Sequence, residues 1–225
     1  MILNALFGGD FRTFFISLLL TLPIVFLSLS VHETAHGYVA YKLGDPTARS
    51  LGRLTLNPLK HLDPIGFLCM LLFGFGWAKP VPINTRYFKK PKRDMAISAM
   101  AGPISNILLA VLFALLLKLE FSSLQWITID TETKFYIFYW LEIFLELAIQ
   151  MNITLAVFNL LPIPPLDGSR LFLTFLPSHL YFKFMRYERV ISIILMLALF
   201  VGLLDPAIDF VSGIFLDLIW KLILL

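Results

Sequence analysis

The amino-acid sequence contains little charge and almost no cysteine. Only 15% of its 225 residues are charged, whereas soluble globular domains carry about 25%. The single cysteine, Cys69, excludes an internal disulfide, and without a second cysteine we expect it to be a packing residue rather than a metal ligand. The net charge of +3 is small. We therefore expect no nucleic-acid partner, and we expect the uneven placement of the basic residues to report membrane orientation instead.

Apolar residues take the place of the missing charged residues. They account for 59% of the chain, with a mean hydropathy of +0.85, and they are grouped into long runs. This pattern is typical of an all-α polytopic membrane protein embedded in a lipid bilayer. The length suits one compact helical bundle, so we expect residues 1–225 to form a single membrane-embedded domain.

Several runs are long enough to cross a bilayer, whose hydrocarbon core is about 30 Å thick. A cleaved signal peptide is the alternative for the first run, and its length disfavours that alternative. Residues 190–204 are a marginal span, and residues 206–225 either span or lie in the interface because they carry three charged side chains. The clear spans are residues 13–41, 94–119 and 135–161.

The connections carry turn residues and some local patterns. Residues 42–61 are polar and rich in turn formers, and alternation at Arg53–Leu56 predicts a short strand there. Residues 169–186 are expected to form a short helix and an amphipathic connection at the membrane surface.

The motif His32-Glu33-Thr34-Ala35-His36 lies near the end of the first span. Ionisable side chains in such a place are costly and indicate a functional site. On a helix, positions i and i+4 share one face, so His32 and His36 can bind one metal ion together. Glu33 lies beside that ion, where a carboxylate can accept a proton from a metal-bound water. A chance cluster at a membrane interface is the alternative.

A catalytic zinc site needs a third protein ligand. Asp167, His61, His179 and Asp63 are candidates. Asp167 is favoured because it follows a long span closely, although alone it would be interpreted as a turn residue. Asp167 reaches His32 and His36 only if all three lie on the same side of the membrane. This requires the short apolar run 62–78 to dip into the bilayer and return to the same side rather than to cross.

The lysine and arginine residues test the two alternatives independently. If residues 62–78 re-enter, most basic residues share the side of the HETAH motif, and Arg12, Lys118 and Lys134 lie on the other; Lys221 is left out because its segment is not assigned to a side. If that run crosses, the basic residues of 42–61 move to the other side and the asymmetry weakens. We therefore predict a re-entrant segment, with the N-terminus outside and the metal site near the cytoplasmic side.

Three motifs in this order resemble the site-2 protease family of intramembrane zinc metalloproteases. They are HETAH in the first span, AGPISN at 101–106 and NLLPIPPLDG at 159–168. The segments GRLTLNPLKHLDPIG and GWAKPVPIN are similar to those of small prokaryotic members. The resemblance implies an endopeptidase of a prokaryotic cell membrane that cleaves membrane-protein or peptide substrates in or near their transmembrane segments.

The resemblance also implies roles for individual residues. His32, His36 and Asp167 would bind one Zn²⁺ per chain, Glu33 would be the general base, and Asn159 would help hold substrate or the developing oxyanion. Residues 79–84 match a strand-like edge against which an extended substrate pairs. We expect neither a PDZ-like insertion nor a C-terminal regulatory domain.

Other interpretations remain open at this level. A metal transporter or metal-binding membrane protein would use the same histidines, but the later spans offer few ionisable residues apart from Glu142 and Glu146. An inactive family member is disfavoured because every catalytic position is filled. Asn106 is interpreted as an interhelical packing residue, and His61 and His179 as polar surface residues.

Overall fold

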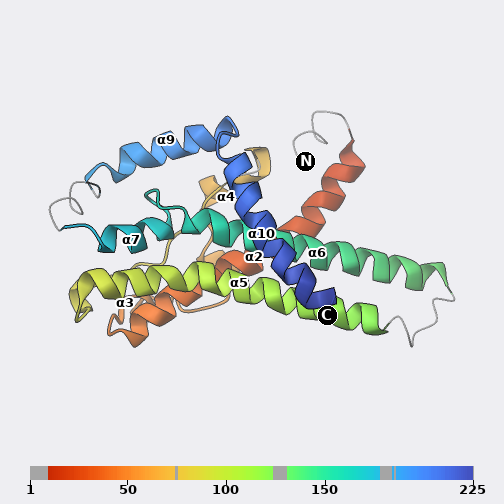
Figure 1. Cartoon of the computed structure of the whole chain (residues 1–225), viewed down its shortest axis with the longest axis horizontal. Coiled ribbons are helices and arrows are strands. Elements are labelled where there is room, and N and C mark those ends of the chain that lie inside the picture. Colours follow the sequence, from red (N-terminus) through yellow and green to blue (C-terminus); the bar gives the residue numbers. More distant parts are fainter. Residues whose placement is uncertain (1–9, 74–75, 124–130, 178–183, 185, 225) are drawn as a thin grey trace.

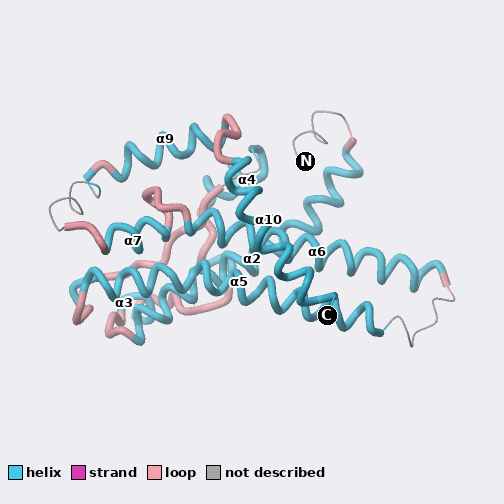
Figure 2. Tube along the Cα trace, viewed as in Figure 1, coloured by secondary structure: helices cyan, strands magenta, loops and turns pink. Residues whose placement is uncertain are grey.

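The computed structural model describes residues 10–73, 76–123, 131–177, 184 and 186–224. Within these ranges the chain forms α-helices joined by turns and short 3-10 segments, with no β-strand (Figure 2). Three helices are long and apolar enough to cross a membrane: α2 (Phe11–Lys42), α5 (Pro91–Ser123) and α6 (Glu132–Leu160). They confirm the all-α polytopic fold and the three full spans expected from the sequence.

Polar side chains at the helix ends explain where these spans begin. The Asp10 carboxylate accepts a hydrogen bond from the Thr13 N–H, and the Thr131 hydroxyl oxygen accepts one from the Lys134 N–H. Such N-caps satisfy donors that have no partner inside a helix. At its other end α2 stops before Gly44, whose φ of 109° is readily available only to glycine.

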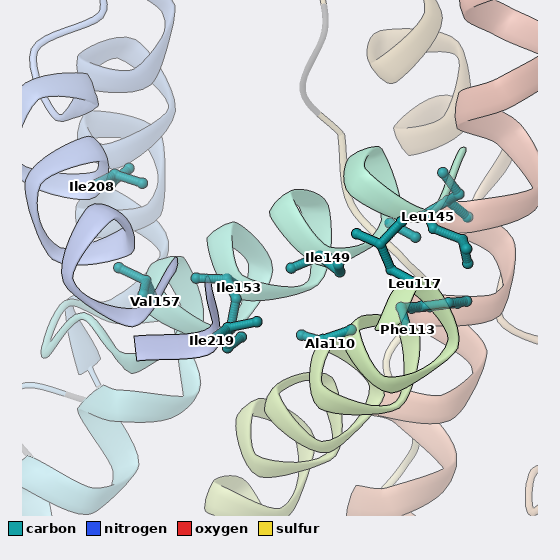
Figure 3. Packing of buried hydrophobic residues seen from close by; sticks show 12 residues of the cluster. Ala110, Phe113, Leu117, Leu145, Ile149, Ile153, Val157, Ile208 and Ile219 are labelled. Carbon is teal, nitrogen blue, oxygen red and sulfur yellow. The ribbon is translucent and has the colours of Figure 1, made fainter. Parts of the chain in front are cut away.

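The bundle is held together along α5, which packs against α6, α2 and α7. Figure 3 shows Ala110, Phe113 and Leu117 of α5 facing Leu145 and Ile149 of α6. Small residues recur in this contact, and alanines at 110, 114 and 148 are fully buried. Lipid is as apolar as these side chains, so close backbone approach and van der Waals packing stabilise the pair more than the hydrophobic effect does.

The two ends of segment 62–78, called the re-entrant hairpin below, lie side by side. Leu62 and Ala78 form an isolated antiparallel bridge, and the Lys79 N–H donates to the His61 carbonyl at 2.8 Å. Helix α4 (Pro64–Phe73) has 10 residues and is therefore about 15 Å long, half the hydrocarbon thickness. A segment whose two ends are paired cannot cross a bilayer, so the re-entrant prediction is confirmed.

Two local expectations about extended structure need correction. Arg53–Leu56 forms no strand and lies in a loop that packs on α2. Residues 79–84 are not part of a sheet either, since the bridge between Leu62 and Ala78 is the only strand-type pairing among the described residues. Neither segment forms a strand because, among the described residues, neither has a neighbouring strand to pair with.

The remaining elements are short, except at the C-terminal end. They are α3 (Thr47–Ser50), η1 (Pro58–Lys60), η2 (Thr85–Tyr87) and α7 (Asp167–Thr174), the last confirming a short helix after the third span. Helices α9 (Glu188–Phe200) and α10 (Asp205–Leu224) form a pair bent by 81° (Figure 1). With 13 residues, α9 is too short to span alone, so the marginal span expected at 190–204 is instead half of this bent pair.

Candidate active site

Three side chains from distant segments converge between α2 and α7. The His32 and His36 Nε2 atoms lie 2.9 Å apart, and Asp167 Oδ2 lies 3.1 Å and 3.2 Å from them. The histidines come from successive turns of α2, and Asp167 is the first residue of α7. Among the described residues this is the one group of three acidic, histidine or cysteine side chains close enough to share a metal ion.

The other ring nitrogen of each histidine is held by α5. His32 Nδ1 donates to Asn106 Oδ1 at 2.6 Å, and His36 Nδ1 donates to the Ser98 carbonyl at 2.8 Å. Both acceptors are oxygens without a proton, so each Nδ1 must carry the hydrogen. In the neutral imidazole this leaves Nε2 with a lone pair, which is the form in which imidazole binds a metal.

This donor set fits a metal ion. Two Nε2 lone pairs and a carboxylate oxygen face one another, and buried Asp167 Oδ2 has no hydrogen-bond partner of its own. Separations near 3 Å are also those of ligand atoms that share a metal at about 2.0–2.2 Å. The cluster therefore has the donor atoms that a metal site needs.

Gly102 lets α5 approach the histidines. A Cβ at this position would lie 2.4 Å from His36 Nε2 and 2.6 Å from His32 Cε1. Any larger side chain would occupy the space of the imidazole rings. The glycine of the AGPISN motif is thus required by close packing at the ligands rather than by backbone conformation.

Glu33 is buried beside the ligands, with 8% of its surface exposed. Its Oε2 accepts a hydrogen bond from the Val81 N–H at 2.7 Å. Val81 belongs to the segment that follows the re-entrant hairpin. The segment that follows the hairpin and the carboxylate expected to act as a base are therefore directly connected.

Asn159 lies in the last turn of α6, where its side-chain amide donates to the Leu155 carbonyl at 2.9 Å. Within the described residues it makes no hydrogen bond to Glu33 or to the three clustered side chains. A role for Asn159 in substrate or oxyanion binding stays a prediction.

Asn106 is the interhelical residue that the sequence predicted, and one of its hydrogen bonds also reaches a clustered histidine. Asn106 is fully buried, holds His32 and donates through Nδ2 to Asn152 Oδ1 at 2.9 Å. Asn152 in turn donates to the Ala148 carbonyl. The sequence signal for Asn106 was its place in AGPISN, whereas Asn152 and the Ser98 carbonyl gave no signal because ordinary interhelical contacts use the same groups.

His61 is misplaced by sequence reasoning. It is 2% exposed rather than on the surface, and its Nε2 donates to the Thr55 carbonyl at 2.7 Å. It lies outside the metal cluster, as does Asp63, whose carboxylate caps α4. His179 lies outside the described residues.

An apolar cavity of about 570 Å³ adjoins the cluster. Its walls come from α2, α6, α9, α10 and the re-entrant hairpin, and it is lined by Pro165 and Leu166, which immediately precede Asp167. Trp77 and Ala78 line it beside the segment that reaches Glu33. The cavity thus lies between membrane-embedded helices and reaches the residue just before Asp167.

The helices that can span a membrane bring together two histidines and an aspartate, with the glutamate of an HExxH motif beside them. This combination is typical of membrane-embedded metallopeptidases. Comparison with known families agrees. The model of peptidase family M50 matches residues 20–203. The chain belongs to this family, that of the site-2 proteases.

Several curated proteins are similar to this chain. YwhC of Bacillus subtilis (strain 168), named as a candidate zinc metalloprotease, is 43% identical over 176 residues, which cover 78% of this chain and 77% of YwhC. Rip2 of Mycolicibacterium smegmatis is 33% identical over 63% of this chain and 51% of its own length. MJ0611 of Methanocaldococcus jannaschii is 34% identical over 62% of this chain and 61% of its own length. No solved structure matches the chain.

Proposed function

We propose that this protein is an intramembrane zinc endopeptidase that hydrolyses peptide bonds in or near transmembrane segments of membrane-protein substrates. The observation that carries the proposal is the convergence of the two Nε2 atoms and the Asp167 carboxylate within 3.2 Å of one another. Membership of family M50 and relatives named as zinc metalloproteases support it.

In this proposal His32, His36 and Asp167 hold one zinc ion per chain. When bound, zinc supplies Lewis acidity and lowers the pKa of a coordinated water to about 7. Glu33 accepts the proton of the attacking water and delivers it to the nitrogen of the leaving amine. Asn159 binds the substrate backbone or the developing oxyanion near the end of α6.

The cavity and the segment that follows the hairpin would receive the substrate. The apolar walls of the cavity suit a transmembrane segment. Leu166 is one of the lining residues, so a substrate in the cavity would lie next to the ligand Asp167. In residues 79–84, Pro80 and Pro82 lack N–H groups, and the N–H groups of Lys79, Val81 and Asn84 are already bonded. A substrate extended along this segment would therefore find mainly carbonyl acceptors there, rather than the donors of a sheet edge.

We further propose that the 225 residues form a single membrane-embedded domain in a prokaryotic cell membrane, with the active site near the cytoplasmic side. Two spans, α5 and α6, separate His36 from Asp167, so the two lie on one side. Most basic residues share that side, which favours the cytoplasm.

Metal transport is the less favoured function. A transport path needs successive polar sites through the membrane. In the part of the chain that the structure describes, the metal-ligand geometry is met at one place, the cluster of His32, His36 and Asp167. An ion bound there would lack a second site to move to.

Purified protein in bilayer nanodiscs tests the proposal. Zinc content is measured by plasma mass spectrometry, and cleavage is measured on a fluorogenic single-span reporter. We expect Glu33→Gln to keep about one zinc per chain and to lose cleavage by about 100-fold or more. Glu132→Gln, at the exposed start of α6, is the matched control and should cleave normally. Normal cleavage by Glu33→Gln, or zinc flux into liposomes that survives it, would reject the protease assignment.

A further inference from the structure

The segment that follows the re-entrant hairpin is fixed to the rest of the protein at several points. It begins where Ala78 pairs with Leu62 and the Lys79 N–H donates to His61. It ends where the Asn84 N–H donates to buried Asp45 at 2.6 Å. Between these anchors the Val81 N–H donates to Glu33. The main chain of this segment therefore sets where the Glu33 carboxylate is held.

The Arg53 side chain hydrogen-bonds to this segment just before Val81. Its Nη2 donates to the Lys79 carbonyl at 2.7 Å and to the Pro80 carbonyl at 3.2 Å. One guanidinium nitrogen thus bridges two successive peptide oxygens. Because these peptides adjoin Val81, the bridge limits rotation of the peptide plane that carries the Val81 N–H.

The loop that carries Arg53 is itself tied to the HETAH helix. The Thr34 hydroxyl donates to the Thr55 carbonyl at 2.7 Å, and His61 Nε2 donates to the same oxygen. The hydrogen bonds therefore form a ring that leaves α2 at Thr34, passes through the loop and the segment after the hairpin, and returns to α2 at Glu33.

Gly37 lets both segments lie directly on α2, one turn after Glu33. A Cβ at Gly37 would lie 2.7 Å from Leu54 Cδ2 and 2.9 Å from Val81 Cγ1. Leu54, which follows Arg53, and Val81 thus both pack closely against Gly37 of α2. A small displacement there would move the Val81 N–H away from Glu33.

We propose that Arg53 is a positioning residue for the general base: by holding the Lys79 and Pro80 carbonyls, it keeps the Val81 N–H on Glu33 and the carboxylate in its reactive orientation. The proposal rests on the protease function proposed above. Arg53 touches neither the metal ligands nor Glu33, so it acts through the main chain of the segment that follows the hairpin. Misplacement of a catalytic group by about 1 Å costs about 100-fold in rate.

The test compares kcat, KM, zinc content and thermal unfolding of Arg53→Ala and Arg53→Lys with wild type in nanodiscs. We expect Arg53→Ala to lower kcat by about 10- to 100-fold, with KM within about twofold and zinc content unchanged. Arg53→Lys should recover part of the loss, because an ammonium donates to a carbonyl but lacks the planar geometry of the guanidinium. Arg49→Ala is the matched control, since Arg49 lies in α3, just before the loop that carries Arg53, and contacts Tyr41.

Gly37→Ala provides a second and independent displacement of Val81. If both changes act through the position of the Val81 N–H, adding Arg53→Ala to Gly37→Ala should lower kcat little further, because coupled changes are non-additive. Unchanged kcat in Arg53→Ala, or a loss that follows zinc content and unfolding temperature in proportion, would overturn the proposal. Glu33→Gln in the same assay keeps the two claims apart: if it is inactive while Arg53→Ala is normal, only the positioning role fails.

Discussion

Asn106 Oδ1 lies 2.6 Å from His32 Nδ1, and this contact joins two helices at residues 74 positions apart in the chain. Asn106 is anchored in turn by its donation to Asn152. Because the Asn106 amide is held from both sides, its oxygen rather than its nitrogen faces the imidazole. The contact therefore sets the tautomer of His32 and directs its Nε2 toward His36 and Asp167.

Replacement of Asn106 by leucine should weaken metal binding without removing a ligand. The leucine cannot accept the Nδ1 hydrogen, so His32 loses its fixed tautomer and orientation. Loss of such an outer partner typically costs about 10- to 100-fold in metal affinity. Competition with a zinc chelator measures the affinity, with Ile104→Ala on the exposed face of α5 as control. An affinity within twofold of wild type would contradict the role of Asn106.

Gly102→Ala should abolish metal binding through steric conflict. Its Cβ would lie 2.4 Å from His36 Nε2, and α5 would have to move away from the ligands. Gly213→Ala in α10 is the control, since nothing lies within 4 Å of a Cβ there. Alanine is favoured over glycine in a helix by up to about 1 kcal/mol, so the control should be neutral or stabilising. Zinc content and thermal unfolding distinguish the two variants.

Filling the cavity should impair substrate binding while leaving the metal in place. Thr154 of α6 lines the cavity, and Thr154→Phe would occupy part of its volume. We expect KM for a transmembrane reporter to rise about 10-fold, which is the size of an effect of 1–2 kcal/mol, with zinc content unchanged. Leu141→Phe on the exposed face of α6 is the control. Unchanged KM would show that substrates bind elsewhere.

Labelling of single cysteines should show that the hairpin does not cross the membrane. In a Cys69→Ser background, cysteines at Leu51, Lys89 and Glu132 are all exposed and lie before the hairpin, after it and at the start of α6. An impermeant maleimide should label positions 51 and 89 from the cytoplasmic face and position 132 from the other. Labelling of 51 and 89 from opposite faces would overturn both the re-entrant segment and the shared metal site.

Local chemistry explains which features the sequence predicted well. Long apolar runs revealed α2, α5 and α6, because a polar backbone in lipid has few alternatives to a helix. The i, i+4 spacing placed His32 and His36 on one face. The re-entrant hairpin followed from a topological constraint, since Asp167 and the histidines can meet only across an even number of crossings.

The errors share a different physical origin. Arg53–Leu56 alternates like a strand but has no strand beside it, and instead it lies against Gly37 of α2. His61 looked like a surface residue, but it is buried, and its carbonyl accepts a hydrogen bond from the Lys79 N–H. In each case the outcome depended on a neighbour that is remote in sequence, which no local pattern contains.

The sequence by itself determined the membrane class, the spans and the kinds of side chain available to a metal, because hydropathy and helical spacing are local properties. Only the tertiary structure decided that Asn106 and Ser98 turn both Nε2 atoms toward Asp167. It alone placed the Val81 N–H on Glu33, 48 positions away. These contacts depend on how α5 and the segment after the hairpin pack on α2, and close packing is a property of the whole bundle rather than of any segment.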